Sequence, residues 1–200
     1  MEATVGLRER KKQRTRQAIV DAAFKLFDER GFDGTTVADI AEAAEIAPRT
    51  FFAYFPSKDD VVFHDFEEKY ETVASWLRER DPGTNTFDAL RAGIASTVGE
   101  VDPEHLREKR LRNRLCENES LAAHSEHLRG RFAELLAEAV AEDLGDAPSD
   151  LRPRLVAAAT AAAMGVIEDL PDGEVEHSVE TLDSLLAFLR GGLAALQEGR

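Results

Sequence analysis

Apolar residues recur three and four positions apart along almost the whole chain, and runs that alternate apolar and polar residues are nearly absent. This spacing is typical of amphipathic α-helices rather than of strands. Together with the turn residues between the apolar runs, it predicts an all-α fold of nine helices. We expect these helices at residues 10–30, 37–44, 48–55, 58–80, 87–101, 103–115, 119–144, 148–170 and 174–197.

Local chemistry sets the boundaries of the first three helices. Gly31 can end the first helix in a left-handed conformation. The Thr36 hydroxyl can cap the second helix by accepting a bond from the backbone N–H of Asp39. Pro48 suits the first turn of the third helix, and Pro56 restricts the conformation of the residue before it. The start of the chain is therefore predicted to contain three separate helices.

The second and third of these helices have helix-turn-helix spacing, because only residues 44–47 join them. Their inward positions are Val37, Ile40, Ala41, Ile46, Phe51 and Phe55. This packing leaves the outer face of the third helix free to enter a DNA major groove, which is about 12 Å wide. We therefore predict a three-helix DNA-binding head with a basic N-terminal arm over residues 1–57. Residues 58–200 are predicted to form a six-helix acidic body, to which the family resemblance described next assigns the regulatory and dimerisation roles.

The segment 24–58, FKLFDERGFDGTTVADIAEAAEIAPRTFFAYFPSK, resembles the DNA-binding head of the TetR (tetracycline-repressor) family of bacterial transcriptional regulators. The resemblance extends over about residues 12–72. It implies a homodimer of nine-helix subunits, a palindromic double-stranded DNA operator and a small-molecule pocket in the body. On this basis we expect a ligand-responsive repressor that its effector releases from DNA.

The same resemblance implies DNA contacts for seven residues. They are Thr36, Pro48, Arg49, Thr50, Phe52, Tyr54 and Lys58. Pro48 and Arg49 would face base edges, and Arg49 is the best candidate to read a guanine. The two threonines, the tyrosine and Lys58 would bond phosphates and fix the register. Phe52 stands where the family commonly has a tyrosine, so we expect it to touch a thymine methyl group instead.

Two further residues depart from the family pattern. Glu45 stands where a glycine is usual in the turn, and a positive φ there would cost a glutamate some free energy. Ala47 stands where a serine usually caps the third helix, and losing that cap costs about 1 kcal/mol. Pro48 offsets part of this loss because its φ is already helical.

The charge is unevenly distributed. The whole chain carries a net charge of −14, but residues 1–60 contribute only −1, with 10 basic and 11 acidic residues. Within the arm, residues 8–16 hold six basic residues and one acid. Arg10, Lys11, Lys12, Arg14 and Arg16 could supply part of the DNA affinity through counterion release. The alternative is a solvated arm with no partner.

The last two predicted helices, 148–170 and 174–197, are expected to form the homodimer. The first is rich in alanine, so another helix can approach it closely. The second carries an apolar stripe that is wider than one core-facing side needs. A purely intramolecular core is the alternative interpretation.

The effector pocket is expected among the middle helices of the body. Its candidate lining residues are Phe66, Tyr70, Leu90, Ile94, Leu111, Leu115, Leu128, Phe132, Met164 and Ile167. The basic cluster Arg107, Lys109, Arg110, Arg112 and Arg114 could hold an anionic effector such as an acyl-CoA. The alternative is a solvated face paired with Glu104, Glu108 and Glu117.

Other function classes find little support. The chain has no Gly-x-Ser-x-Gly, phosphate-loop, His-Glu-x-x-His or Gly-x-Gly-x-x-Gly motif, so we expect neither an enzyme nor a cofactor. His124 and His127 could bind a metal but are more typical of a helix surface, and Cys116 alone is a weak thiol-sensing candidate. No apolar run approaches the ~20 residues of a membrane helix, and a cytoplasmic location is expected. A helical interaction protein that no longer binds DNA is the alternative function.

Overall fold

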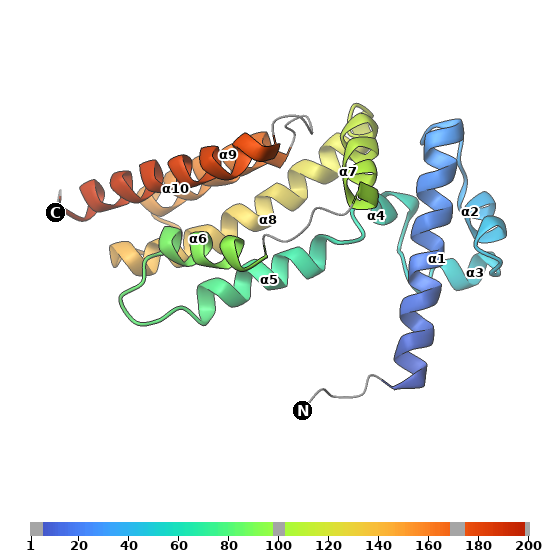
Figure 1. Ribbon diagram of the computed structural model, residues 1–200, viewed down its shortest axis with the longest axis horizontal. Helices are drawn as coiled ribbons and strands as arrows, with labels where there is room; N and C mark the ends of the chain where they lie inside the picture. Colours follow the sequence, from blue (N-terminus) through green and yellow to red (C-terminus); the bar gives the residue numbers. More distant parts are fainter. Residues whose placement is uncertain (1–5, 98–102, 169–174, 199–200) are drawn as a thin grey trace. The chain divides into compact units, whose positions relative to one another are not determined.

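The computed structural model describes the backbone of residues 6–97, 103–168 and 175–198, and the side chains of 6–96, 107–166, 181 and 183–198. Over these ranges the chain forms ten α-helices and no strand, which confirms the all-α class (Figure 1). The helices are α1 (Leu7–Arg30), α2 (Val37–Ala43), α3 (Pro48–Phe51), α4 (Lys58–Val62), α5 (Phe66–Arg78), α6 (Thr86–Thr97), α7 (Pro103–Leu115), α8 (Glu119–Leu144), α9 (Leu151–Glu168) and α10 (Val175–Glu198).

One helix more than predicted is present because the expected helix 58–80 is two helices, α4 and α5. The three residues between them all have partners on α1, α7 or α8. The His64 ring packs edge-on against Phe24, and the Asp65 carboxylate accepts hydrogen bonds from Arg112. Consecutive residues of an α-helix point about 100° apart, so an unbroken helix could not direct three in a row to one side.

Further boundaries differ from the prediction, and α9 begins at Leu151 rather than at residue 148. α1 begins at Leu7, three residues earlier than expected. α3 ends at Phe51 rather than Phe55, and the backbone then continues as turns in which Phe51 O accepts from the N–H groups of both Tyr54 and Phe55, at 2.9 and 3.0 Å. Pro56 disfavours helical geometry at the residue before it, so the segment tightens instead of extending the helix.

The chain divides into two compact units. Unit 1 comprises Met1–Asp65 and Arg107–His124, and unit 2 comprises Phe66–Leu106 and Ser125–Arg200. Sequence patterning placed a single boundary after residue 57. The compact units group α4, most of α7 and the start of α8 with the first three helices, and the functional division after residue 57 stays a prediction.

The core of unit 1 holds α2 and α3 against α1. Ile19, Phe27, Ile40 and Phe51 are almost completely buried in it. Residues from far along the chain complete this core: Leu111 and Leu115 of α7 and Leu121 of α8. Since Phe51 is the only buried residue of α3, its contacts determine how that helix is oriented.

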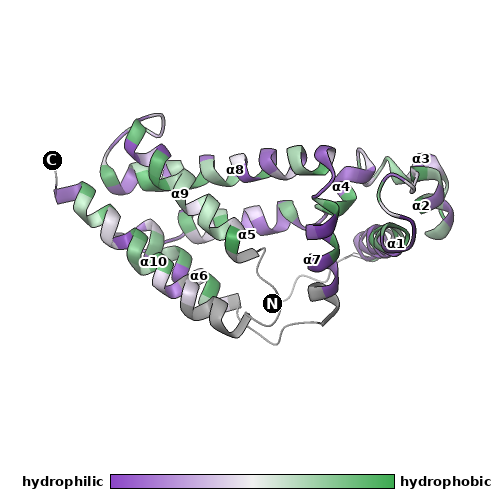
Figure 2. Ribbon diagram, turned by 90° about the horizontal axis from the view of Figure 1, so that it is seen from above, coloured by the Kyte–Doolittle hydropathy of each residue, from purple (hydrophilic) through white to green (hydrophobic). Residues whose placement is uncertain are grey.

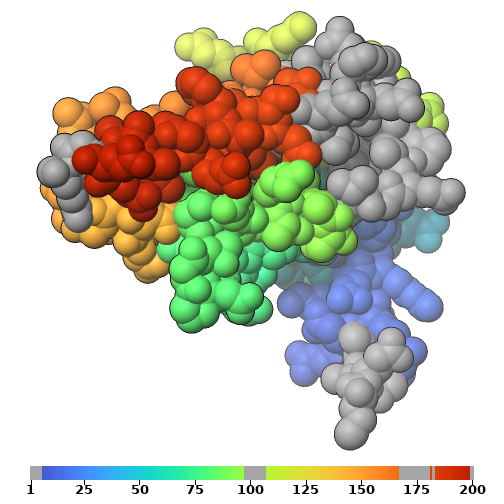
Figure 3. All heavy atoms as spheres, turned by 60° about the vertical axis from the view of Figure 1, so that its left-hand side comes forward, coloured from blue at the N-terminus to red at the C-terminus, as the bar shows by residue number. Residues whose placement is uncertain are grey.

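Unit 2 contains α5, α6, α9, α10 and most of α8. Its core is formed by residues of all five helices, among them Leu77, Phe87, Leu90, Leu136, Ala157 and Leu186. α5 and α6 cross closely at Gly93, where an added Cβ would lie 2.1 Å from the Trp76 indole. α10 runs beside α9 and α6, and its contact with α6 is visible at the surface in Figure 3.

The turn between α2 and α3 is a Schellman motif. The N–H of Ile46 bonds to Ala41 O at 2.9 Å, and the N–H of Glu45 bonds to Glu42 O at 3.1 Å. This motif requires a left-handed residue after the C-cap, and glycine usually supplies it. Here Glu45 occupies the position with φ of 54°, so the turn does require a positive φ of this glutamate.

Replacement of Glu45 by glycine should raise the free energy of unfolding by about 1 kcal/mol, because glycine adopts a positive φ without steric cost. Urea titration monitored by circular dichroism measures the change. The matched control is Glu42→Gly, which lies in regular helix and should lower stability by about 1 kcal/mol. Equal losses in both variants would show that the φ of Glu45 carries no strain.

Candidate nucleic-acid interface

α3 presents a polar and partly aromatic surface because its apolar side is fully used in the core. Phe51 and Phe55 are buried, and their rings lie 5.9 Å apart. Pro48 and Arg49 are exposed, while Thr50 and Tyr54 are half-buried. Phe52 is 58% exposed, with its ring edge-on to Phe51 at 5.5 Å. Five of the seven predicted DNA-binding residues therefore lie together on or directly after α3.

Arg49 is the free cation of this surface. Its side chain is exposed and makes no hydrogen bond or ion pair with the residues that the structure describes. A guanidinium with five unused N–H donors can approach the two acceptors of a guanine in a bidentate geometry. The surface thus pairs a directional donor, Arg49, with an exposed apolar ring, Phe52.

The N-terminus of α3 carries no side-chain cap. Ala47 is the N-cap residue, and no side-chain hydrogen bond satisfies the first N–H groups of the helix. Pro48 at the first helical position reduces the number of unpaired donors because it has no N–H. The expected cap loss at Ala47 is confirmed.

Thr36 is exposed, but its hydroxyl already has partners. It accepts a bond from the Asp39 N–H at 3.2 Å and donates to the Asp39 carboxylate, which also accepts from the Thr36 N–H at 2.8 Å. These side-chain and backbone bonds from Thr36 lower the pKa of Asp39, so the carboxylate stays ionised. The capping role is confirmed, and it places a negative charge beside the hydroxyl that was expected to meet a phosphate.

Lys58 is directed into the protein. Its ammonium donates to Phe32 O at 2.7 Å and Thr35 O at 2.9 Å, and lies 4.1 Å from the centre of the Phe32 ring. A phosphate contact would leave these carbonyls without their partner, so the geometry favours a role in holding α4 to the loop between α1 and α2. The predicted phosphate contact stays a prediction that the structure does not favour.

Arg16 was expected to be a free charge of the arm, but its guanidinium has partners inside unit 1. Its guanidinium donates to His64 O and lies over the Phe55 ring, 4.8 Å from the ring centre. Arg16 therefore links the α4–α5 junction to the residue that seats α3. A run of basic residues in the sequence gives no sign that one of them serves an internal contact.

The candidate effector residues are distributed over both units. Phe66, Tyr70 and Phe132 form one aromatic cluster in unit 2, with ring centres 5.3 to 5.9 Å apart. Leu90 and Ile94 belong to the core of unit 2, Leu128 is buried and Met164 is half-buried. By contrast, Leu111 and Leu115 fill the core of unit 1. The side chain of Ile167 lies outside the described residues.

A cation is fixed against the aromatic cluster. The Arg131 guanidinium lies 4.8 Å from the centre of the Phe66 ring and 4.7 Å from that of Tyr70, and it donates two hydrogen bonds to Glu67. This pairing lowers the pKa of Glu67 and raises that of Arg131. Neither sequence motif nor helical spacing indicated that Arg131 would join these rings.

Two hollows of unit 2 are lined by other residues than those predicted for the pocket. One, of about 580 Å³, lies between the α5–α6 loop and the ends of α8 and α10, and its residues include Arg80, Asn85, Glu138 and Asp143. The other, of about 270 Å³, lies between α6 and α10 over Phe87 and Leu186. Neither contains a member of the aromatic cluster.

The basic cluster of α7 is used partly within unit 1. Arg112 pairs with Asp65 at 3.1 Å and Arg114 pairs with Asp28 at 2.7 Å. Figure 2 shows that α7 is largely hydrophilic, in keeping with such surface pairs. These two partners are aspartates of unit 1 rather than the glutamates expected from the sequence, and Glu104 lies outside the described side chains.

The last candidates from the sequence are two histidines, considered as metal ligands, and one cysteine, considered as a thiol sensor. The His124 ring stacks on Phe63 at 4.9 Å, His127 is exposed and Cys116 is a half-buried free thiol. Over the described ranges, no three His, Cys, Asp or Glu side chains are arranged to hold a metal ion. In the same ranges no helix combines the length and apolar character that a bilayer crossing requires.

Two sequence profiles match the chain. The family described as "Bacterial regulatory proteins, tetR family" matches residues 19–64, and "MftR C-terminal domain" matches residues 84–194. The HTH-type transcriptional regulator TcmR of Streptomyces glaucescens is 35% identical over 95% of this chain and 89% of its own length. The putative mycofactocin biosynthesis transcriptional regulator MftR of Mycobacterium tuberculosis is 29% identical over 98% of both chains.

Solved structures share the fold at lower identity. Salmonella enterica GusR aligns over 92% of this chain and 95% of its own, with a TM-score of 0.58 and 24% identity. Thermus thermophilus FadR in complex with lauroyl-CoA aligns over 86% and 93%, with a TM-score of 0.53 and 22% identity. The SmeT–triclosan complex aligns over 92% and 88%, with a TM-score of 0.54 and 22% identity.

Replacement of Lys58 by alanine should lower the free energy of unfolding by about 2 kcal/mol, because the ammonium bonds two backbone carbonyls. Urea denaturation measures this loss, and the exposed Lys25→Ala serves as the control with little effect. Unchanged stability together with weaker DNA binding would contradict an internal role for Lys58 and would support the predicted phosphate contact.

Proposed function

Since the chain belongs to the TetR family of bacterial regulatory proteins, we propose that it is a DNA-binding transcriptional repressor that a small-molecule effector releases from a palindromic operator. One observation carries the proposal. Phe51 and Phe55 are buried so that α3 turns Arg49 and Phe52 outward, with no protein partner for the Arg49 guanidinium among the described residues. A helix held in this way is suited to the major groove.

The surface of α3 divides into base contacts and phosphate contacts. Arg49 is proposed to read a guanine, with Pro48 beside it at the base edges, and the exposed Phe52 ring to cover a thymine methyl group. The half-buried Thr50 and Tyr54 are proposed to bond phosphates through their hydroxyls and so fix the register. We leave Lys58 and the Thr36 hydroxyl out of the contact set because both have partners inside unit 1.

An exposed apolar stripe on α9 supports a homodimer. Its members recur at helical spacing and are all exposed: Leu151, Leu155, Ala158, Ala159, Ala162 and Val166. The opposite side of α9 is already used in the core of unit 2, where Ala157 and Ala161 are buried. A contiguous stripe of this kind marks an interaction surface.

The neighbouring α10 presents a matching surface. Phe188 is 75% exposed, and the small residues Ser184, Gly191, Gly192 and Ala195 lie around it at helical spacing with their surfaces exposed. Small side chains permit another helix to approach closely, and Phe188 can fill the space that they leave. We therefore propose that α9 and α10 pair with α9 and α10 of a second copy. A two-fold dimer would present two α3 helices to half-sites one DNA turn apart, about 34–36 Å.

The effector site is proposed in unit 2 around the aromatic cluster of Phe66, Tyr70 and Phe132. Three aromatic rings beside the Arg131–Glu67 ion pair suit a ligand that has an apolar body and a polar group. Leu111 and Leu115 are removed from this set because they fill the core of unit 1. FadR and SmeT bind lauroyl-CoA and triclosan, respectively, in the structures that share this fold.

The proposal is tested by selecting bound fragments from random double-stranded DNA. A repressor of this kind should enrich a palindrome with half-sites one turn apart, and an effector should lower its affinity for that sequence. A coupling free energy of about 1–3 kcal/mol corresponds to a 5–150-fold change. Failure to enrich any sequence would favour the alternative of a helical interaction protein.

Replacement of Arg49 by alanine should cost about 1–3 kcal/mol of operator affinity and relax preference at one base pair per half-site, because one bidentate base contact is lost. Fluorescence anisotropy with the selected operator and its single-base variants measures both effects. Tyr54→Phe is the comparison variant and should weaken binding with base preference unchanged. Equal weakening of R49A on operator and random DNA would contradict the reading role.

Replacement of Leu155 by glutamate should convert the dimer to a monomer, because the stripe would then bury an unpaired carboxylate between the two copies. The side chain is 59% exposed in one protomer, so the monomer should keep its helicity. Sedimentation velocity at micromolar concentration measures the assembly. Arg154→Glu is the control, because Arg154 is exposed but lies off the stripe. A wild-type monomer under these conditions would overturn the proposed dimer.

A further inference from the structure

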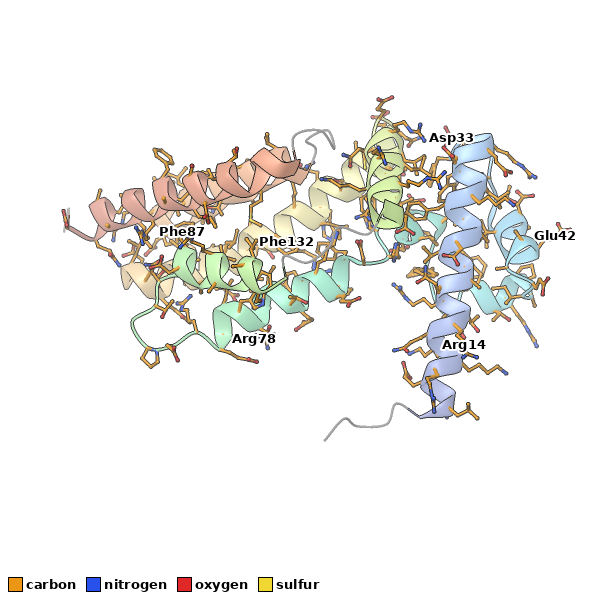
Figure 4. All side chains as sticks on the ribbon, viewed as in Figure 1. Arg14, Asp33, Glu42, Arg78, Phe87 and Phe132 are labelled. Carbon is orange, nitrogen blue, oxygen red and sulfur yellow. The ribbon has the colours of Figure 1, made fainter. Side chains whose placement is uncertain are left out.

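The first three turns of α1 extend beyond the core of unit 1. The first buried residue of α1 is Ile19, and every residue from Gly6 to Arg14 is exposed. Leu7, the first residue of the helix, is 81% exposed. We call residues 7–17 the basic extension, and at 1.5 Å per residue it is about 16 Å long. In Figure 1 it runs past α2 and α3, and Figure 4 shows Arg14 projecting from it into solvent.

Most charges of the basic extension are unpaired among the residues that the structure describes. Five of its basic side chains make no hydrogen bond or ion pair with the described residues: Arg8, Arg10, Lys11, Lys12 and Arg14. Glu9 is its sole acid. One acid against six basic residues leaves most of the positive charge without a counter-charge within the extension.

These charges also oppose the helix that carries them. Arg8 and Lys12, and likewise Arg10 and Arg14, are four residues apart, and like charges at this spacing destabilise a helix. Positive charge in the first turn adds to this because it opposes the helix dipole. The N-cap residue is Gly6, which has no side chain with which to cap the helix. A polyanion along the helix would remove the repulsion, so its binding and the helical state of the extension are coupled.

The base of the basic extension is attached to the DNA-reading element. Arg16 lies over the Phe55 ring and donates to His64 O, which ties the last turn of the extension to the residue that seats α3. The extension therefore leaves the core of unit 1 close to the turns that follow α3 (Figure 1). Its five free cations complement a phosphate backbone in charge.

The composition of the basic extension favours DNA over a membrane surface. A helix that lies in a lipid interface needs an apolar face, and Leu7 is the sole large apolar residue among residues 7–17. A partner protein would likewise find no apolar stripe to bury. A phosphate backbone can be bound through positive charges alone, and the basic extension has these charges.

We propose that the basic extension is a second DNA-contacting element, which binds backbone phosphates flanking the half-site read by α3 and is stabilised as a helix by the phosphates it neutralises. This inference rests on the proposed function, because it presupposes a DNA site held by α3. It assigns affinity and footprint length to the extension, and base preference to α3. Arg16 is excluded from the phosphate contacts because its guanidinium is used inside unit 1.

The experiment uses the full chain and the selected operator in two lengths, one with about ten flanking base pairs (roughly one DNA turn) on each side and one trimmed to the half-sites. The test variant is Lys11→Gln/Arg14→Gln, which removes two free charges and keeps good helix-forming residues. The matched control is Lys25→Gln/Arg30→Gln, with the same charge change at exposed positions farther along α1. Affinity is measured over a range of salt concentrations, and hydrogen exchange is followed for residues 7–17.

The expected result is a shallower salt dependence for the test variant on the long duplex. Each lost phosphate contact reduces the slope by about 0.9, so the loss is about 1.8 per bound subunit. The control should match the wild type, trimming should weaken the wild type more than the test variant, and base preference should be the same in all three. The long duplex should slow amide exchange in residues 7–17 of the wild type.

Three outcomes would overturn the inference. An unchanged slope in the test variant would show that the extension does not meet DNA. Altered base preference would show that it acts on α3 instead of on flanking phosphates. Binding to vesicles of phosphatidylglycerol and phosphatidylcholine that the test variant loses, with an unchanged DNA slope, would assign the charges to a membrane surface. A wild-type protein that prefers no selected duplex would overturn the proposed function as well, so the two failures are distinguishable.

Discussion

The burial of Phe51 and Phe55 against α1 is the contact on which the DNA-reading surface depends. α3 has only four residues in regular helix, and a helix of that length has no stability of its own in water. Its orientation therefore comes from the two phenylalanine rings, which are buried with Ile40 and Phe27 in one core. Arg49 and Phe52 face outward because their neighbours face inward. The orientation of the DNA-reading surface is therefore a consequence of how the hydrophobic core is packed.

The structure sorts the cations of unit 1 into two groups. Lys58, Arg16 and Arg112 bond carbonyls or carboxylates within the unit, and leaving these acceptors unpaired would cost more than an exposed phosphate contact returns. Arg49 and five cations of the basic extension, Arg8, Arg10, Lys11, Lys12 and Arg14, have no such partners among the described residues and can approach DNA. A chain with a net charge of −14 can in this way present a positive surface where α3 and α1 meet a polyanion.

α9 illustrates a second constraint, because it is apolar on two sides. One side completes the core of unit 2, and the other leaves Leu155 and Val166 exposed in a single protomer. Membership of the TetR family supports the interpretation that a second copy covers this stripe. The small residues of α10 around Phe188 fit the same interpretation, since close helix approach requires short side chains.

The sequence by itself determined the features that depend on neighbours along the chain. The α2 cap by Thr36, the start of α3 at Pro48, the pairing of Phe51 with Phe55 and the all-α class follow from local spacing, and the family followed from the same residues. Tertiary structure alone decided which core each apolar face enters and which cations remain free. Leu111 and Leu115 show an apolar face in the sequence, but only folding reveals that this face completes the core of unit 1 instead of a ligand pocket. Lys58 and Arg16 lie 23 or more residues from the carbonyls that accept their hydrogen bonds. Residues 63–65, where the predicted helix is broken, likewise contact residues that are far away in the sequence. Periodicity reports that a side must be buried, whereas its partner depends on contacts between residues that are far apart in the chain.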